Sequence, residues 1–237
     1  MLRLLNIVFL LTLADSSSAR LYLGYSLNHF QYREPSVMKQ HGPMQGLELG
    51  KFWRNSLGSL QIGGEYHFGH LTYEGSGLFD PTVSIKQRTP HQIWHFSGTQ
   101  TFGPGKFRPR LGLAYRYWND KNGPNYQRET SYLYLPIGIQ IFLNFNLILN
   151  LDYYYFIRGQ NESDLMGGIK LTQKNGYGLH ANLTYFLNRN LYTKLRLTYW
   201  DIQDSELGPE VPNMPGSFFL EPENNTLHSS VVIGFLF

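Results

Sequence analysis

One pair of side chains has the types and spacing of a general base and a nucleophile. His95 and Ser97 lie two residues apart, so they share one face if this segment is a strand. Trp94 and Phe96 make the better apolar face, which turns His95 and Ser97 inward. No acidic partner can be assigned by spacing, and a triad is recognised by geometry and roles rather than by two residues. We therefore predict two polar side chains on an inner face and assign no catalytic residue.

Histidines and acids also gather near one polar stretch of the chain. Imidazole and carboxylate groups together can activate water or bind a metal ion. The members of this group are His67, His70, Glu74, Asp80 and His91. Such clusters arise by chance in polar loops, and no motif of paired aspartates accompanies them. The sequence therefore predicts no metal site and no cofactor, and the chain is not expected to be an enzyme.

A third group of charged residues occupies alternate positions within apolar segments. The predicted lumen charge network consists of Glu48, Glu65, Arg108, Arg110, Arg116, Asp152, Lys194 and Arg196. Buried charges need partners, so these residues could form ion pairs that plug a narrow barrel. They could equally line a charged constriction in a water-filled pore, which would weakly favour anions because basic members outnumber acidic ones. The narrow interior expected of ten strands favours the plug.

The segments that carry these charges alternate with a period of two residues, which is typical of strands with one face in lipid. Between residues 132 and 142, Leu133 and Ile141 fall on the apolar face and Gln140 on the other. In the next segment Asp152 and Arg158 are predicted to lie inside, because a charge that faces lipid is costly. This cost decides, for each strand, which set of alternate residues faces lipid and which faces the lumen.

Ten strands are expected, near residues 20–32, 44–55, 57–69, 91–102, 107–118, 130–143, 146–158, 177–187, 191–201 and 226–237. Short turns alternate with longer polar connections near 33–43, 70–90, 119–129, 159–176 and 202–225. This asymmetry is typical of outer-membrane barrels with both chain ends inside. The predicted fold class is an all-β, transmembrane, antiparallel up-and-down barrel of ten strands, with eight or twelve as alternatives.

One further segment alternates without fitting this count. Leu165 to Gln173 has the strand pattern, and Lys174, Asn175 and Gly176 make a good hairpin turn. Counting it as a spanning strand would require a twelfth strand near Ser217 to Glu221. We expect instead a hairpin that protrudes above the membrane.

The last expected strand ends the chain on an aromatic residue. Val231, Ile233, Phe235 and Phe237 line one face, and together they are predicted to form a barrel-assembly signal. At the other end, residues 1–19 have the basic start, short apolar stretch and small-residue cleavage site of a secretory signal peptide. The barrel domain is then expected to span residues 20–237.

The composition agrees with a membrane surface built from strands. Aromatic residues make up 16% of the 237 residues and charged residues only 16%, below the roughly 25% of soluble proteins. The mean hydropathy of -0.31 argues against helical spans. Without cysteine there is no disulfide, no Cys-based zinc site and no thiol nucleophile. The small net charge of +3, scattered along the chain, makes nucleic acid an unexpected partner.

Several short motifs resemble those of a family of bacterial outer-membrane β-barrel proteins that groups loosely with OmpA-like and porin-like domains. The motifs are Tyr32-Arg33-Glu34-Pro35 with Met38, Gln127-Arg128-Glu129, Tyr132 to Gly138, Tyr199-Trp200-Asp201-Ile202 with Ser205, and Glu221 to Thr226. The resemblance covers most of the expected mature chain. It implies the fold and a place in the outer membrane, and it carries over no site.

These observations lead to one expected function and three alternatives. We expect a structural or surface-interaction protein of the outer membrane with at most a narrow pore. Expected partners are membrane lipid and lipopolysaccharide, the barrel-assembly machinery at the last strand, and an extracellular ligand at the loops. A small-solute channel is the first alternative. The others are hydrolases: the His-x-Ser pair resembles that of barrel lipid A deacylases, and ten strands is the size of omptin proteases.

Overall fold

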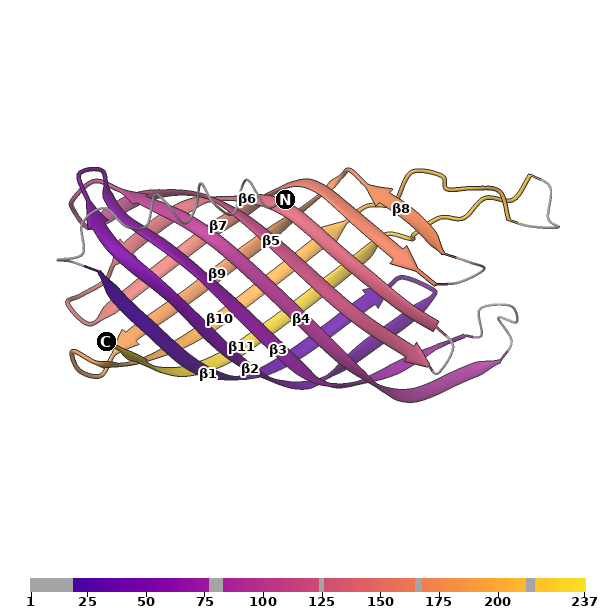
Figure 1. Ribbon diagram of the computed structural model, residues 1–237, viewed down its shortest axis with the longest axis horizontal. Coiled ribbons are helices and arrows are strands. Elements are labelled where there is room, and N and C mark those ends of the chain that lie inside the picture. Colours follow the sequence, from indigo (N-terminus) through magenta and orange to yellow (C-terminus); the bar gives the residue numbers. More distant parts are fainter. Residues whose placement is uncertain (1–18, 77–82, 124–125, 165–167, 212–215) are drawn as a thin grey trace.

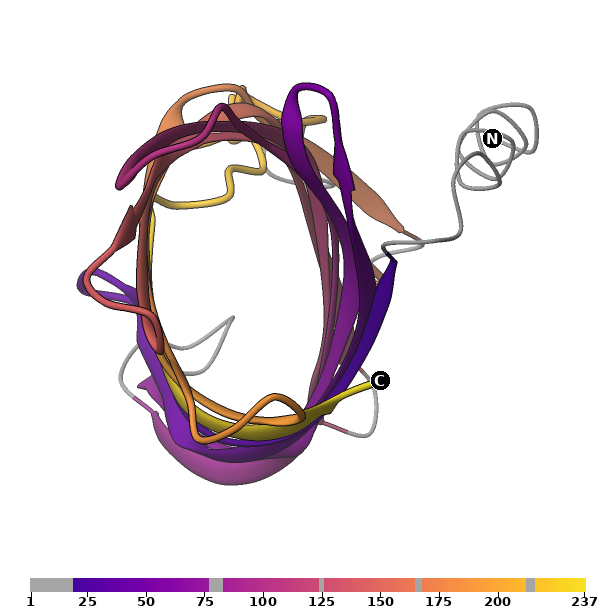
Figure 2. The same cartoon turned by 90° about the vertical axis from the view of Figure 1, so that its left-hand side faces the viewer.

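The computed structural model describes residues 19–76, 83–123, 126–164, 168–211 and 216–237. These residues form an antiparallel barrel with strongly tilted strands (Figure 1), and the wall closes into an oval ring (Figure 2). The strands are β1 (Arg20–Glu34), β2 (Met38–Asn55), β3 (Gly58–Ser76), β4 (Ser84–Phe102), β5 (Phe107–Gly123), β6 (Tyr126–Phe142), β7 (Leu147–Ser163), β8 (Ile169–Gln173), β9 (Gly176–Phe186), β10 (Leu191–Ile202) and β11 (Asn224–Leu236). Among the described residues no helix is long and apolar enough to span a membrane. The predicted signal peptide lies outside them, apart from Ala19.

Ten of the eleven strands make the closed wall, which confirms the predicted fold class. β1 pairs with β11, and β6 pairs with β7, so the sheet has no free edge around the ring. β8 is the exception. It pairs only with residues 159–163 of β7, whereas β9 pairs with residues 147–155 of the same strand. Residues 169–173 of the predicted segment thus form a hairpin strand at one end of the barrel, as expected, while residues 165–167 lie outside the described residues.

The two faces of the wall differ in chemistry. Apolar side chains project outward, and Leu195, Val231 and Ile233 are each more than half exposed. Inward side chains are mainly aromatic, polar or charged, and many are almost completely buried. Glycine makes room for the larger ones: a Cβ at Gly63 would overlap the hydroxyl of Tyr22, which fills the lumen beside it. Side chains therefore fill much of the interior, as expected for a barrel of this size.

The strands are longer than a membrane requires. A tilted transmembrane strand needs about 9–11 residues, whereas β2 to β7 contain 17 to 19 residues each. The excess lies at the end opposite the two termini of the barrel, next to the long connection between β10 and β11 (Figure 1). We refer to this as the extracellular end, by the asymmetry of outer-membrane barrels.

This extension corrects the predicted loops. The stretches expected as loops at 33–43 and 119–129 are mostly strand, and β1 joins β2 through a tight turn in which Ser36 has φ of 63°. The loop expected at 70–90 is likewise shortened by β3 and β4. Above the membrane a strand needs no apolar face, so the hydropathy pattern fades while backbone pairing continues. Only the connection between β10 and β11 keeps the predicted length.

The predicted inward position of Arg158 is wrong. A β-bulge shifts the register of β6 and β7, so that Leu133 pairs with Arg158 but Tyr134 pairs with Phe156. The extra residue, Ile157, changes the phase of the strand, and both Ile157 and Arg158 are exposed on the outer wall. The alternation of apolar and polar residues cannot by itself reveal a bulge, because the extra residue, Ile157, is of a type that also fits a regular strand.

Candidate functional site

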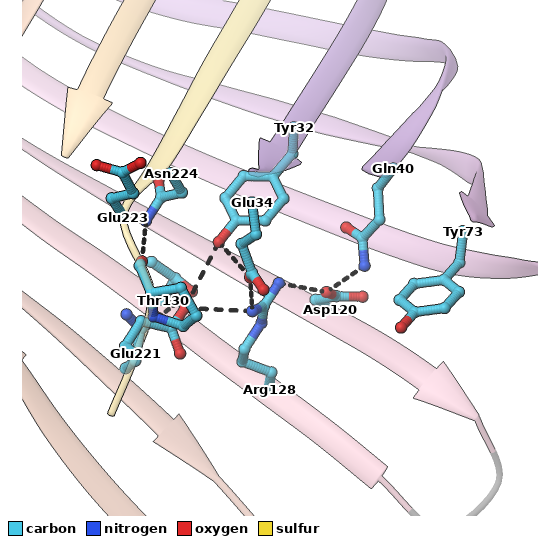
Figure 3. A network of polar contacts seen from close by, with 12 residues as sticks. Tyr32, Glu34, Gln40, Tyr73, Asp120, Arg128, Thr130, Glu221, Glu223 and Asn224 are labelled. Carbon is cyan, nitrogen blue, oxygen red and sulfur yellow. Dashed lines mark hydrogen bonds and ion pairs between the residues drawn. The ribbon is translucent and has the colours of Figure 1, made fainter. Parts of the chain in front are cut away.

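Four charged side chains meet inside the barrel at its extracellular end (Figure 3). Nη1 of Arg128 lies 2.6 Å from Oε1 of Glu34 and 3.2 Å from Oε1 of Glu221. Nη2 of the same guanidinium lies 3.3 Å from Oδ2 of Asp120. We call these residues, Glu34, Asp120, Arg128 and Glu221, the Arg128 cluster. One cation is therefore shared by three carboxylates.

Neutral side chains complete the hydrogen bonding of the Arg128 cluster. The Tyr32 hydroxyl donates to Glu34 at 2.7 Å, and Nε2 of Gln40 donates to Asp120 at 2.7 Å. Nδ1 of His91 lies 3.2 Å from the other oxygen of Asp120. The rings of Tyr32 and Trp118 pack against the guanidinium of Arg128, with centroids 5.1 and 5.6 Å from its central carbon. All of these side chains are almost fully buried.

Segments far apart in the chain position the Arg128 cluster. Glu34 ends β1, Asp120 lies near the end of β5, and Arg128 lies near the start of β6. Glu221 comes from the connection before β11, where its backbone N–H donates to Oγ of Ser205 and its carbonyl accepts from the Ser205 N–H. Further backbone bonds, such as Gly208 N–H to Phe219 O, order this connection as a hairpin. The cluster thus ties the last extracellular connection to three strands.

Excess negative charge sets the electrostatics of this layer. Burial raises the pKa of Glu221 to about 7, and the neighbouring Glu34 carboxylate acts in the same direction, while Arg128 opposes it. Protonation of Glu221 near neutral pH therefore relieves repulsion within the cluster.

A second charged layer lies deeper in the barrel. Nζ of Lys194 lies 2.7 Å from Oε1 of Glu48, and Arg196 also pairs with Glu48. The other amino group of Arg196 lies 2.8 Å from Oε2 of Glu65. The Tyr192 hydroxyl donates to Glu48 at 2.6 Å. These bonds run across the lumen from β10 to β2 and β3. In the wall, β11 and β1 separate β10 from β2.

The remaining residues of the predicted lumen charge network lie elsewhere. Arg110 forms a separate pair with Asp152, with Nε 3.6 Å from Oδ1. Arg108 stacks on Phe142 at the periplasmic end and donates to the Gly105 carbonyl. Arg116 has no carboxylate within 4.0 Å among the described residues. The structure therefore unites four of the eight predicted residues, joins two as a pair and leaves two arginines apart.

The Arg128 cluster was missed by reasoning from the sequence. Glu34, Arg128 and Glu221 all lie in the motifs that carry the family resemblance, but nothing in their spacing predicted that they meet. Asp120 was expected in a loop. The available signal was position: Glu34, Arg128 and Glu221 each lie close to an expected strand end, and Glu34 and Glu221 each precede a proline.

The candidate catalytic residues do not form a reactive arrangement. His95 and Ser97 both face the interior, but Nε2 of His95 contacts the Tyr134 hydroxyl at 2.6 Å rather than Ser97. His67 and His91 are buried inside the barrel, whereas His70 is exposed. Within the residues that the structure describes, no group of three or more His, Asp or Glu side chains could hold a metal ion. Asp80 lies outside the described residues.

The Glu74 carboxylate belongs to the outer wall. It lies 2.7 Å from Nζ of Lys86 and 3.8 Å from Nε2 of His41. It therefore takes part in surface ion pairs on β2 to β4 and not in an internal site.

A cavity of about 110 Å³ is lined by residues of the deeper charged layer and by none of the Arg128 cluster. Its wall includes Glu65, Arg110, Arg116, Asp152 and Arg196. Above it, Trp118 and Asp120 are fully buried. The Arg128 cluster and its aromatic neighbours thus occupy the interior at the extracellular end.

The residues of the predicted assembly signal occupy the outer face of the last strand. Val231, Ile233 and Phe235 are each a little over half exposed, and Phe237 is 65% exposed. The Phe237 N–H donates to the Leu21 carbonyl at 2.8 Å, so the end of the chain is paired with the start of the barrel. This geometry leaves the apolar face of the strand available to lipid.

A closed ten-stranded barrel with an apolar outer wall and a polar interior defines a β-barrel of the outer-membrane class. The outer membrane protease OmpT from Escherichia coli has a similar structure, with a TM-score of 0.53 and 10% identity over 95% of this chain and 99% of that one. The β domain of the Bordetella autotransporter BrkA gives a TM-score of 0.45 at 11% identity, with 92% and 99% of the two chains covered. The attachment invasion locus protein Ail of Yersinia pestis gives 0.39 at 8% identity, with 93% and 99% covered.

No protein family and no curated protein matches the sequence. At such low identity the likeness to OmpT concerns the fold alone.

Proposed function

We propose that this chain is an outer-membrane protein that acts at the cell surface and does not conduct solutes through its barrel. The observation that carries this proposal is the Arg128 cluster, whose buried side chains occupy the lumen at the extracellular end. An open pore would need a continuous hydrated path. Instead Arg128 bonds to carboxylates from β1, β5 and the last connection, so three sides of the lumen meet at one guanidinium.

The ordered hairpin between β10 and β11 is the proposed interaction surface. Backbone bonds join its two described arms, residues 203–211 and 216–223, while Leu207, Phe218 and Leu220 are 69%, 48% and 44% exposed. Apolar side chains on an extracellular projection favour contact with a partner outside the cell. Residues 1–19 are proposed to direct export, and the apolar face of the last strand is proposed to be recognised by the barrel-assembly machinery.

An enzymatic role has less support. A hydrolase needs an acid or base within hydrogen-bond reach of a nucleophile or water. His95 is engaged with Tyr134, and the Asp120 and His91 pair is sealed beneath Arg128 and Trp118. We therefore propose a role in binding rather than catalysis.

Planar-bilayer recording tests the closed lumen. We expect residues 20–237, refolded and heat-modifiable on gels, to show no steady ohmic current, because the Arg128 cluster blocks the extracellular end. Arg110→Ala and Arg196→Ala are recorded in parallel, since both side chains line the internal cavity. A steady current that changes in size or ion selectivity with either substitution would refute the proposal and establish a channel.

The outer wall carries basic side chains on one side of the extracellular extension. Arg33 on β1 lies opposite Lys39 on β2 in the strand register. Lys86 and Arg88 lie on β4, which is separated from β2 by β3. Arg33, Lys86 and Arg88 are exposed, and Glu74 is the one carboxylate set among them in the register of these strands. The phosphate groups of lipopolysaccharide are anions that suit such a basic surface. We therefore propose lipopolysaccharide as the lipid partner of this basic wall, formed by Arg33, Lys39, Lys86 and Arg88.

Charge reversal tests the basic wall. Each Lys or Arg near an anionic surface contributes about 1 kcal/mol, so the triple variant Arg33→Glu, Lys39→Glu, Arg88→Glu should bind lipopolysaccharide on the order of 100-fold more weakly. The thermal unfolding midpoint of the protein in neutral detergent is recorded at increasing lipopolysaccharide concentrations. The measurement is the concentration that gives half of the maximal increase in this midpoint. The matched control reverses three basic residues on and near β7 and β8, namely Arg158, Lys170 and Lys174. Equal losses in both variants would contradict a localised lipid site.

A further inference from the structure

The internal cavity has buried polar atoms in its wall that lack hydrogen-bond partners among the described residues. They include Nη1 of Arg116, Oγ1 of Thr226 and Nε2 of His228, and all three residues line the cavity. Arg116 is 6% exposed and Thr226 is 1% exposed. An N–H or O–H group that is buried without an acceptor is unfavourable. Nη1 of Arg116 therefore calls for an acceptor within the cavity, whereas Oδ1 of Asp152 in the same wall lacks a donor and lies 3.6 Å from Nε of Arg110.

The positive charge of Arg116 also indicates an acceptor within the cavity. Arg110 and Arg196 each have a carboxylate partner, whereas Arg116 has none within 4.0 Å among the described residues. The rings of Tyr132, Phe30 and Trp118 surround its guanidinium, with centroids 5.4, 5.7 and 5.8 Å from the central carbon. Aromatic rings attract a cation but accept hydrogen bonds only weakly. Arg116 thus brings a positive charge to the cavity wall without a carboxylate partner among the described residues.

The cavity is reached from the periplasmic end. Side chains between the cavity and the extracellular end are fully buried, since Trp118 and Asp120 are 0% exposed. Its wall is accessible on the other side: Gln61, near the start of β3, is exposed, and Glu65 and His95 are 24% and 20% exposed. A volume of about 110 Å³ accommodates a small ion with a few waters.

We propose that this cavity binds a small inorganic anion that enters from the periplasm and is held by Arg116, with Thr226 and His228 as further donors. The guanidinium supplies the charge and a fixed pair of N–H groups, which suits an anion better than neutral solutes. The ion stops beneath the Arg128 cluster, so the site is a dead end and not part of a conduction path. Its occupancy is independent of whether the extracellular loops bind a partner.

Anion titration of the refolded chain, residues 20–237, tests this site. Sodium phosphate and sodium chloride are added separately in zwitterionic detergent, with a bulky sulfonate salt keeping the ionic strength constant. Tryptophan fluorescence is the readout, because Trp118 contacts Arg116 and Trp200 lines the cavity. We expect a saturable change with at least one of the two ions, which also identifies the preferred anion. No saturable change in a heat-modifiable barrel would overturn the proposal.

Variants connect that response to the site. Arg116→Gln should weaken the apparent affinity by about tenfold or more, since hydrogen bonds to charged groups are the stronger ones. Arg158→Gln, an exposed arginine on the outer wall, should retain the affinity of the unaltered chain. Equal affinities in Arg116→Gln and the unaltered chain would refute the role of Arg116.

A thiol probe keeps the proposal testable if Arg116→Gln fails to fold. The chain has no cysteine, so Ser97→Cys introduces a single thiol into the cavity wall. We expect an anionic methanethiosulfonate reagent to label it faster than a cationic one, and the preferred anion to slow the labelling. Thr226→Val, which removes only the hydroxyl, should reduce that protection several-fold. Labelling that is faster with the cationic reagent, or that no anion slows, would overturn the proposal.

Discussion

Arg128→Met is expected to lower the free energy of unfolding by about 3–5 kcal/mol near neutral pH, because removing one partner of a buried ion pair leaves uncompensated charge. Here Glu34, Asp120 and Glu221 would remain in one almost fully buried layer without their shared cation. The measurement is the urea concentration at the midpoint of unfolding in detergent. Unfolding is monitored by the loss of the heat-modifiable, folded band on gels.

Two comparisons separate this effect from a general loss of arginine. Arg158→Met removes an exposed arginine and should change stability by no more than about 0.5 kcal/mol. Adding Glu34→Gln and Asp120→Asn to Arg128→Met should restore part of the loss, because the carboxylates then no longer repel each other. If Arg128→Met proves as stable as Arg158→Met, the Arg128 cluster does not hold the extracellular end together.

The hairpin between β10 and β11 is expected to loosen as the pH rises from about 5 to 8. The pKa of Glu221 is raised from its ordinary value of 4.5 to about 7, chiefly by burial. A carboxyl whose folded pKa is raised stabilises the folded form fully below the unfolded pKa, and that contribution disappears as the pH passes the folded pKa. The difference corresponds to about 3 kcal/mol between pH 4.5 and 7.

Hydrogen exchange of residues 203–211 and 216–223 at pH values between about 5 and 8 measures this effect, after correction for the intrinsic pH dependence of exchange. Glu221→Gln keeps the side chain neutral, so opening of the hairpin should become nearly independent of pH. Glu223→Gln changes an exposed carboxyl two residues away and should retain the original pH dependence. A hairpin whose opening does not change with pH in the unaltered chain would exclude Glu221 as the controlling group.

Much of the barrel could be predicted because its strongest signals are local. Alternation in segments such as Leu133 to Ile141 depends only on side chains pointing to opposite faces of a strand, and the apolar face must then lie in lipid. The same reasoning placed Asp152 inside and Val231 and Ile233 outside, as the structure has them. Where the chain leaves the membrane this constraint ends, and the extensions of β1, β2, β5 and β6 were taken for loops.

The sequence by itself determined the alternation of the membrane-spanning strands, the ten-stranded closed wall and some of the charged residues that line the interior. Only the tertiary structure decided which of those charges meet, because partners across a barrel depend on the tilt and stagger of all its strands. Glu48 pairs with Arg196 from a strand far along the chain, while Arg116 has no carboxylate partner among the described residues. The Arg128 cluster depends still more on closure, since Glu34, Asp120, Arg128 and Glu221 come together only when β1 and β6 face each other across the closed ring.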